Sequence, residues 1–325
     1  MKARKLPSGS WNIRVTVGGQ TYSFTDPDKK KVRSMAAQFA EEYRENVSNP
    51  PLCKCLEDFI EEHRDMLSPS TVRGYLSIVN AIRSRSPQLA NKRIVALTDK
   101  DVQDIIKPIQ APQTQRNYVN LIQASTGRKF AVRYHQKPPK EIAVPSDLEV
   151  LGLLEVFKST EMEIPIMLGA YGGLRRGEIS ALTISDLDGD YITISKDMIL
   201  TDDHEWIIKP PKTQTSNRTI LLPHFVAEKI RQNGYVTTLK PNEITNRLRR
   251  KMAALEIVPA YSFHSLRHYS ASYLHAQGIP DAYIMARGGW ASPHVMQKVY
   301  RHALTDKVAE MEHKAVDSFQ FPFQD

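Results

Sequence analysis

The sequence predicts a multidomain α+β protein with a small β-sheet-plus-helix module, an all-helical bundle, and a mainly α-helical domain containing a small antiparallel sheet. Three observations support this prediction. Polar and apolar residues alternate at two places, helical periodicity fills the segment between them, and 325 residues can form two or three separate cores. We place the three domains at residues 1–50, 51–140 and 146–325.

The amino-terminal module is predicted from residues 10–25, SWNIRVTVGGQTYSFT, which alternate around Gly18-Gly19. Two alternating runs joined by two glycines are typical of a β-hairpin. A helix is expected over 32–47, and Asn49-Pro50-Pro51 marks the end of the module. Its predicted apolar stripe comprises Ala36, Ala37, Phe39, Ala40 and Tyr43.

Residues 51–145 predict helices only. We expect helices over 52–66 and 71–85, a Thr98-capped helix ending at Ile106, and the longest helix over 114–134. The polar, proline-rich stretch 136–146 predicts a linker. Cys53 and Cys55 lack a second ligand pair at zinc spacing, so we expect reduced thiols, one facing the core and one the surface.

The carboxy-terminal region predicts helices around a small sheet. Helices are expected over 148–158, 165–171, 178–182 and 242–255, the last with Arg247, Arg249, Arg250 and Lys251 on a basic face. Strands are expected within 190–200 and 205–222. Lys212 would lie in the turn of the last hairpin, between Ile208 and Ile220.

The net charge of +8 is unevenly distributed. Residues 1–50 carry 9 basic and 5 acidic side chains, residues 51–145 carry 15 and 9, and residues 146–325 carry 20 and 22. A basic excess confined to the first two segments is expected if they bind a polyanion. The sequence contains no apolar run of membrane-spanning length and no apolar signal core, so we expect a soluble cytoplasmic protein.

Residues suited to phosphate chemistry cluster near the carboxy terminus. His264 and Arg267 are three apart and share a helix face, and a short helix opened by Ser292-Pro293 is expected to carry Tyr300. An exposed His/Arg pair is also a common solvated surface, so this signal alone is weak. No carboxylate cluster suggests Mg²⁺ and no glycine-rich loop suggests a nucleotide, so we expect no cofactor.

Five motifs together carry a resemblance to a known family: GLRRGEI at 173–179, KTQTSNRTI at 212–220, HSLRH at 264–268, GGW at 288–290, and Tyr300. In this order and spacing they resemble the tyrosine recombinase, or phage-type integrase, family. The G-x-R pattern with glutamate three residues later selects Arg175 rather than Arg176. The resemblance implies the catalytic residues Arg175, Lys212, His264, Arg267, Trp290 and Tyr300, with Glu178 in support.

The resemblance also implies a role for each of these residues. Arg175 and Arg267 would hold the phosphate oxygens, Tyr300 would attack phosphorus, and Lys212 would protonate the leaving oxygen. His264 would accept a proton or donate to the phosphate. Trp290 stands where many family members have a second histidine, and Glu178 would orient Arg175 or a neighbouring helix. Two rival phenols are set aside, because Tyr273 is expected on an apolar stripe and Tyr283 precedes Trp290, out of family order.

The same resemblance identifies residues 1–50 as an arm-type DNA-binding domain and 51–140 as a core-binding domain. Trp11 is expected in the core of the first. Candidate DNA contacts are Arg4, Lys5, Arg14, Tyr22, Lys29 and Lys30 in the first domain, Arg73, Arg116, Lys129 and Arg133 in the second, and Arg247 in the third. Expected partners are double-stranded DNA with core and arm-type sites, three further copies in a homotetramer, a host DNA-bending protein and an excisionase.

The function expected from the resemblance is site-specific recombination for a phage or integrative mobile element, through a 3′-phosphotyrosyl intermediate and a Holliday junction. Two alternatives stay open. One is a nicking-closing enzyme similar to type IB topoisomerases, and the other is a DNA-binding regulator with a decayed active site. The alternating tail with Phe319, Phe321 and Phe323 is hypothesised to dock on a neighbouring protomer, with packing on its own chain nearly as favoured.

Overall fold

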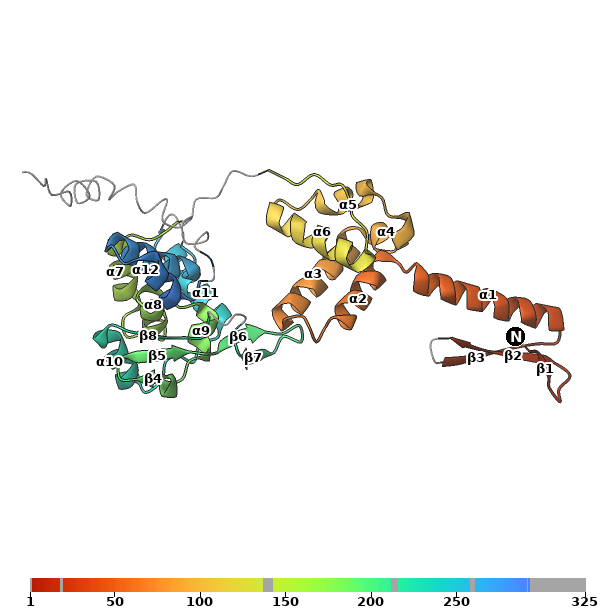
Figure 1. The fold of residues 1–325 in the computed structure, drawn as a ribbon, viewed down its shortest axis with the longest axis horizontal. Coiled ribbons are helices and arrows are strands. Elements are labelled where there is room, and N and C mark those ends of the chain that lie inside the picture. Colours follow the sequence, from red (N-terminus) through yellow and green to blue (C-terminus); the bar gives the residue numbers. More distant parts are fainter. Residues whose placement is uncertain are drawn as a thin grey trace, which may run out of the picture. The chain divides into compact units, whose positions relative to one another are not determined.

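The computed structural model describes residues 2–17, 20–136, 143–211, 216–257, 261–290 and residue 292 (Figure 1). The chain divides into two compact units, residues 1–138 and 139–325. Several predicted features lie outside the described residues, namely the Gly18-Gly19 turn, most of the 136–146 linker, Lys212, the Tyr300 helix and the phenylalanine-rich tail. The division into three domains stays a prediction.

The first unit begins with an antiparallel sheet of β1 (Arg4–Lys5), β2 (Trp11–Val17) and β3 (Gln20–Asp26), followed by helix α1 (Lys29–Ser48). Alternation directs Ile13 and Val15 toward Val32, Ala36 and Ala40 of α1, and all five are buried. The register pairs Val17 with Gln20, which confirms the predicted hairpin.

Helix α1 differs from its prediction at two points. It begins three residues before the expected Val32, where the Asp28 carboxylate accepts the Lys30 amide at 2.7 Å. Ala37, expected on the apolar stripe, is exposed. Ala36 and Ala40 are one turn apart on the face that meets the sheet, whereas Ala37 is rotated about 100° away from Ala36.

The helical part of this unit has its own hydrophobic cluster, which includes Leu56, Val79 and Ile122. Thr98 caps a helix as predicted, with its hydroxyl accepting the Asp101 amide, and Ser68 caps another by accepting the Thr71 amide. The elements are α2 (Leu52–Glu62), α3 (Pro69–Arg85), α4 (Pro87–Ala90), η1 (Ile94–Ala96), α5 (Asp99–Ile106) and α6 (Pro112–Thr126).

The helix predicted over 114–134 ends earlier, because Gly127 adopts the left-handed conformation at φ 66° and terminates α6. The chain then continues without helix, and Phe130 returns to the same hydrophobic cluster. At 15 residues α6 is shorter than α3, which has 17, so the expectation that it would be the longest helix of this segment was wrong.

The two cysteines also depart from their prediction, since both are buried. Helix α2 packs against α3 on one flank and α6 on another, so positions two residues apart are both covered. The Cys53 thiol lies 3.8 Å from the carbonyl oxygen of Val79, and the Cys55 thiol lies 3.3 Å from that of Ser125. Burial raises the pKa of both thiols.

The second unit is mainly helical and is built around α8, which contacts α7, α9, α10 and α12 (Figure 1). Its helices are α7 (Asp147–Phe157), α8 (Glu163–Ala170), α9 (Arg176–Ala181), η2 (Ile184–Asp186), α10 (His224–Asn233), α11 (Pro241–Ala254), α12 (Phe263–Ala276) and α13 (Asp281–Gly288). None of the helices described in the chain is both long and apolar enough to cross a membrane.

The strands of the second unit are antiparallel, as predicted. They are β4 (Leu187–Asp188), β5 (Tyr191–Ile194), β6 (Asp197–Leu200), β7 (Trp206–Lys209) and β8 (Arg218–Leu221). They form a sheet in the order β4-β5-β8 and a separate β6-β7 pair.

The predicted last hairpin is wrong, because β7 and β8 do not pair with each other. Ile194 pairs with Arg218 and Asp197 pairs with Lys209, so β7 and β8 both pair with the arm formed by β5 and β6. Lys212, predicted in the turn of that hairpin, lies outside the described residues.

Candidate active site

A single buried carboxylate organises the site. Glu178, in the first turn of α9 and 2% exposed, accepts hydrogen bonds from the Arg175 amide at 2.9 Å and the Arg175 Nη1 at 2.6 Å. Arg218, whose side chain is 6% exposed, donates from Nη1 at 3.2 Å and Nη2 at 2.9 Å. Burial alone would raise the pKa of Glu178, but Arg218 and then Arg175 outweigh it and lower that pKa. Glu178 therefore stays ionised and fixes both guanidinium groups.

The adjacent arginines 175 and 176 have different environments. Arg175 donates from Nη2 to the Gly289 carbonyl at 3.1 Å and keeps 36% of its side chain exposed. Arg176 points elsewhere, donating from Nη1 to the Thr245 hydroxyl of α11 at 2.6 Å. Arg175, and not Arg176, is therefore the arginine held by Glu178.

Arg267 enters the site from α12 and is fully buried. Its Nη1 donates to the Gly173 carbonyl at 2.7 Å, and its guanidinium carbon lies 4.0 Å from the centroid of the Trp290 ring. Burial and the neighbouring Arg175 lower the pKa of Arg267 to about 9, so the side chain stays charged at neutral pH. Within the described part of the chain its Nε and Nη2 have no hydrogen-bond acceptor. A buried cation with two unused donors is suited to binding an anion.

These contacts form a closed chain. Arg267 is bonded to Gly173, two residues before Arg175; Arg175 is bonded to Gly289; and Trp290, next in sequence, lies against Arg267. The Trp290 ring approaches Gly288 so closely that a Cβ there would lie 2.0 Å from it, which requires glycine. The two arginines therefore cannot shift independently.

Two histidines at the start of α12 lie beside Arg267. Their rings, His264 and His268, are 4.6 Å apart and nearly perpendicular, with His264 exposed and His268 buried. Desolvation lowers the pKa of both to about 4, helped at His264 by His268 and Arg267, and at His268 by Arg267. Both rings are therefore neutral at pH 7, and a neutral imidazole can accept a proton.

Residues 147–307 match the phage integrase family. The chain belongs to this family of tyrosine recombinases. The family resemblance inferred from the sequence is thereby confirmed.

Individual relatives of this integrase-family chain are distant. A XerC-like tyrosine recombinase of Caldanaerobacter subterraneus subsp. tengcongensis is 24% identical over 217 residues, which cover 55% of this chain and 56% of that protein. The chain thus matches little more than half of its relative's length.

Solved structures show a similar fold. The Tn1549 transposon integrase, determined with transposon right end DNA, matches with a TM-score of 0.63 and 20% identity, over 82% of this chain and 99% of that one. A lambda integrase dimer bound to a core site matches with a TM-score of 0.57 and 16% identity, over 92% and 94%.

Among the predicted catalytic residues of the integrase-family chain, the structure brings together Arg175, Glu178, His264, Arg267 and Trp290. Lys212 and Tyr300 lie outside the described residues. Of the rival phenols, Tyr283 is 70% exposed and Tyr273 is 43% exposed, so the expectation that Tyr273 lies on an apolar stripe was wrong. The buried run of α12 ends at Ser272, where the helix emerges from the core.

The sequence interpretation missed Arg218. Besides holding Glu178, it donates from Nε to the Arg287 carbonyl at 2.7 Å. The Arg287 side chain in turn donates to the carbonyls of Leu221 and Tyr171 at 2.8 and 2.9 Å. One signal was present, because Arg218 lies two positions before the apolar Ile220 and shares its strand face. An arginine facing the core needs a hydrogen-bonding or charged partner there.

The candidate DNA contacts in the amino-terminal module lie on both faces of its sheet and in the first turn of α1. Arg4 and Arg14 lie on the outer face, where Asn12 donates to the Ser23 and Thr25 hydroxyls at 2.7 and 2.8 Å. The remaining four are exposed. Lys5 and Tyr22 lie on the sheet face that meets α1, and Lys29 and Lys30 open α1 itself. The Nζ atoms of Lys5 and Lys29 lie 5.9 and 4.3 Å from the centroid of the Trp11 ring, and the ring centroids of Tyr22 and Phe39 are 4.7 Å apart. Trp11 itself is half-buried against the small core, in line with its prediction.

The other candidates are dispersed within their units. Arg116, Lys129 and Arg133 are exposed and Arg73 is half-buried. Arg116 lies 5.3 Å from the centroid of the Tyr134 ring. Arg247 is ion-paired with Glu161.

Proposed function

We propose that the chain is a site-specific DNA recombinase, an integrase that cuts and rejoins duplexes through a 3′-phosphotyrosyl intermediate. The observation that supports this most strongly is the closed chain of contacts that fixes Arg175 and Arg267. Two guanidinium groups from separate elements can bind both non-bridging oxygens of one phosphodiester. Because they are already in place, they can stabilise the added negative charge of the transition state without rearranging.

In the proposed reaction the Tyr300 oxygen attacks phosphorus while the bond to the 5′ oxygen breaks. The phenolic proton passes to His264, which is neutral at pH 7, and Lys212 gives a proton to the departing 5′ oxygen. Attack by a 5′ hydroxyl from another strand reverses these steps, and four strand exchanges proceed through a Holliday junction. The phosphotyrosyl bond conserves the energy of the phosphodiester, so the chain needs no nucleotide or metal. Trp290 can donate a hydrogen bond but cannot carry a proton.

The proposed partners are duplex DNA with core and arm-type sites, and three further copies of the chain. Residues 1–50 would bind the arm sites and 51–140 would close over the core site. The neighbours support this assignment by analogy, since one is an integrase solved with transposon DNA and another is a lambda integrase tetramer bound to a Holliday junction. A phage or integrative mobile element is the proposed source, with a host DNA-bending protein and an excisionase as accessory factors.

Covalent trapping tests the proposal. Wild type, Tyr300→Phe and Tyr283→Phe would be incubated with nicked duplexes from a library of element–chromosome junctions and separated on a denaturing gel. We expect adducts on a few sequences with wild type and Tyr283→Phe, and none with Tyr300→Phe. Tyr283 is the matched control because it is an exposed phenol of the same unit.

Two other results would contradict the proposal and favour another function. Adducts on arbitrary DNA would indicate a nicking-closing enzyme. Specific binding without any adduct would indicate a regulator.

A further inference from the structure

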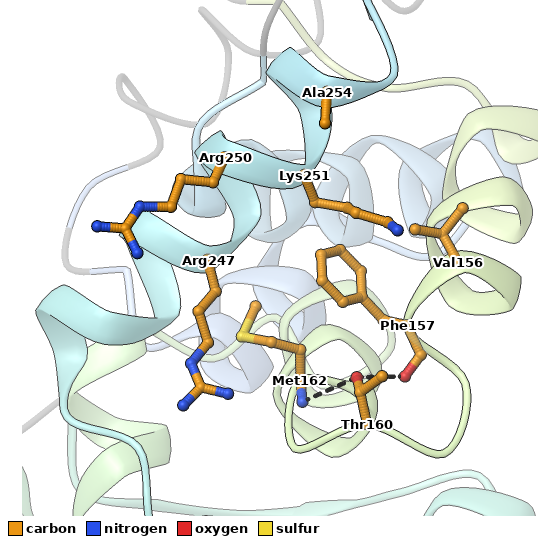
Figure 2. Close-up of a pocket in the computed structure, with 8 residues that line it drawn as sticks. All are labelled: Val156, Phe157, Thr160, Met162, Arg247, Arg250, Lys251 and Ala254. Carbon is orange, nitrogen blue, oxygen red and sulfur yellow. Dashed lines mark hydrogen bonds between the residues drawn. The ribbon is translucent and has the colours of Figure 1, made fainter.

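A pocket of about 390 Å³ opens in the second unit between the end of α7, the turn that follows it, and one flank of α11 (Figure 2). Phe157 and Met162 lie at its centre, with Val156 and Ala254 beside them. The cationic side chains Arg247, Arg250 and Lys251 project from α11 along one side of this apolar floor. Its volume lies within the range of small binding pockets.

The turn that forms one wall is held by several hydrogen bonds. The Thr160 hydroxyl donates to the Phe157 carbonyl at 2.6 Å and accepts the Met162 amide at 3.2 Å (Figure 2). Ser159, at φ 58°, donates its amide to Glu163 at 2.8 Å, and Glu163 is ion-paired with Lys229 at 3.0 Å. This wall is therefore preformed and does not need a ligand to order it.

The charge around the pocket is unbalanced. Glu161 pairs with Arg247, but Arg250 and Lys251 have no ion pair in the described part of the chain. Both are exposed at the rim, so an anionic group could reach them without displacing a carboxylate. The pocket thus combines an apolar floor with two available positive charges.

This pocket is separate from the candidate active site. On α11, Thr245 accepts a hydrogen bond from Arg176, which begins α9 next to the site residue Arg175. Successive helical residues are about 100° apart, so Arg247, Arg250 and Ala254 lie roughly 140–200° around the helix from Thr245. A phosphodiester held by Arg175 and Arg267 would be on the other flank.

From these observations we infer that the pocket binds an acidic peptide segment of a partner protein, with one large apolar side chain seated over Phe157 and Met162. An aromatic or leucine side chain would bury the apolar floor, and flanking aspartates or glutamates would pair with Arg250 and Lys251. A DNA backbone fits the pocket less well, because its phosphates can pair with the cations but leave the apolar floor exposed to water. The inference concerns a surface outside the recombination site and does not depend on the proposed reaction.

Fluorescence anisotropy of the full-length chain with a labelled peptide, Glu-Asp-Glu-Phe-Glu-Asp-Glu, tests the inference. Replacing the phenylalanine by serine, or all acidic residues by their amides, should each weaken binding at least about 10-fold, equivalent to about 1.4 kcal/mol. Arg250→Gln should weaken it about 3- to 10-fold by removing a pairing charge.

Two neighbouring alanines provide matched variants. Ala254 lines the pocket and Ala253 does not, yet both are exposed in the last turn of α11. Ala254→Glu should weaken the peptide at least about 10-fold and Ala253→Glu less than about 2-fold, because only the first places bulk and negative charge in the pocket. Equal thermal unfolding midpoints would show that both fold.

Three results would overturn the inference. Equal effects of the two alanine variants would mean that the peptide binds elsewhere. If Ala254→Glu weakened the binding of duplex DNA and Ala253→Glu did not, the pocket would be assigned to the phosphate backbone. Binding only after deletion of residues 316–325 would assign it to the chain's own tail.

Discussion

The candidate active site and the outer face of the amino-terminal sheet use arginine in opposite ways. In the site, Arg175, Arg218 and Arg267 are held by a buried carboxylate, backbone carbonyls and an indole ring. On the sheet, Arg4 and Arg14 are exposed and have no ion pair among the described residues. Fixed arginines stabilise one geometry, whereas free ones add charge that a partner can use. Substitutions of the fixed arginines should change the rate of covalent adduct formation and the free energy of unfolding. Substitutions of the exposed arginines should change the affinity for DNA and its salt dependence.

The largest effect is expected from Arg267→Lys. Lysine keeps the charge but loses the planar contact with Trp290 and the second donor that can meet a phosphate oxygen. The rate of covalent adduct formation should fall about 10²- to 10³-fold, the usual loss for one fixed transition-state donor. Arg176→Lys is the control, expected to change the rate less than about 5-fold because Arg176 is outside the Glu178 network. Comparable losses in the two variants would contradict the distinction between fixed and peripheral arginines.

Glu178→Gln should produce the next largest effect. The amide preserves the shape of the side chain but leaves Arg175 and Arg218 close together without a counter-charge. Removing one partner of a buried ion pair costs about 3–5 kcal/mol of unfolding free energy. Urea denaturation of the full-length chain measures this loss.

The matched control for this variant is Glu228→Gln, which breaks an exposed pair with Arg231. It should leave the denaturation midpoint unchanged, because exposed pairs contribute little. A Glu178 variant as stable as this control would show that the network does not hold the site together.

The next largest effect is expected from acidification, which should lower the free energy of unfolding. The pKa of His268 is about 4 in the folded chain and 6.5 as a free side chain, so between these values the unfolded chain binds more protons. Stability should therefore rise with pH from about 4 to about 6.5 and be level above, with His268 accounting for at most about 3 kcal/mol. Glu178 acts in the same direction. Because its pKa is lowered in the folded chain, its contribution to stability is lost as the pH falls through that pKa. Urea denaturation of His268→Gln should show a smaller slope in this range, and an unchanged slope would exclude His268 as its source.

Local signals in the sequence predicted much of this molecule. Thr98 predicted a helix cap, alternation predicted the first hairpin, and the motifs around Arg175 and Arg267 predicted the two arginines of the site. The errors arose where the outcome depends on distant partners. Whether β8 pairs with β7 or β5 decides where Arg218 lies, and Glu178 is 40 positions away from it. Cys53 and Cys55 are both buried because two other helices cover α2, which helical periodicity cannot reveal.

The smallest effect is expected from substituting an exposed arginine on the outer face of the amino-terminal sheet. Arg14→Gln removes one exposed charge from a face whose polar neighbours, Asn12 and Ser23, hydrogen-bond each other. If Arg14 contacts a phosphate, the slope of log K against log salt for an arm-site duplex should fall by about 1, while the adduct rate on a core-site duplex stays constant. Lys54→Gln is the control, since Lys54 is already paired with Asp58 at 2.7 Å and should leave the slope unchanged. An equal slope change in both variants would mean that only net charge matters, and an altered core-site rate would mean that the sheet face acts on the chemistry as well as on affinity.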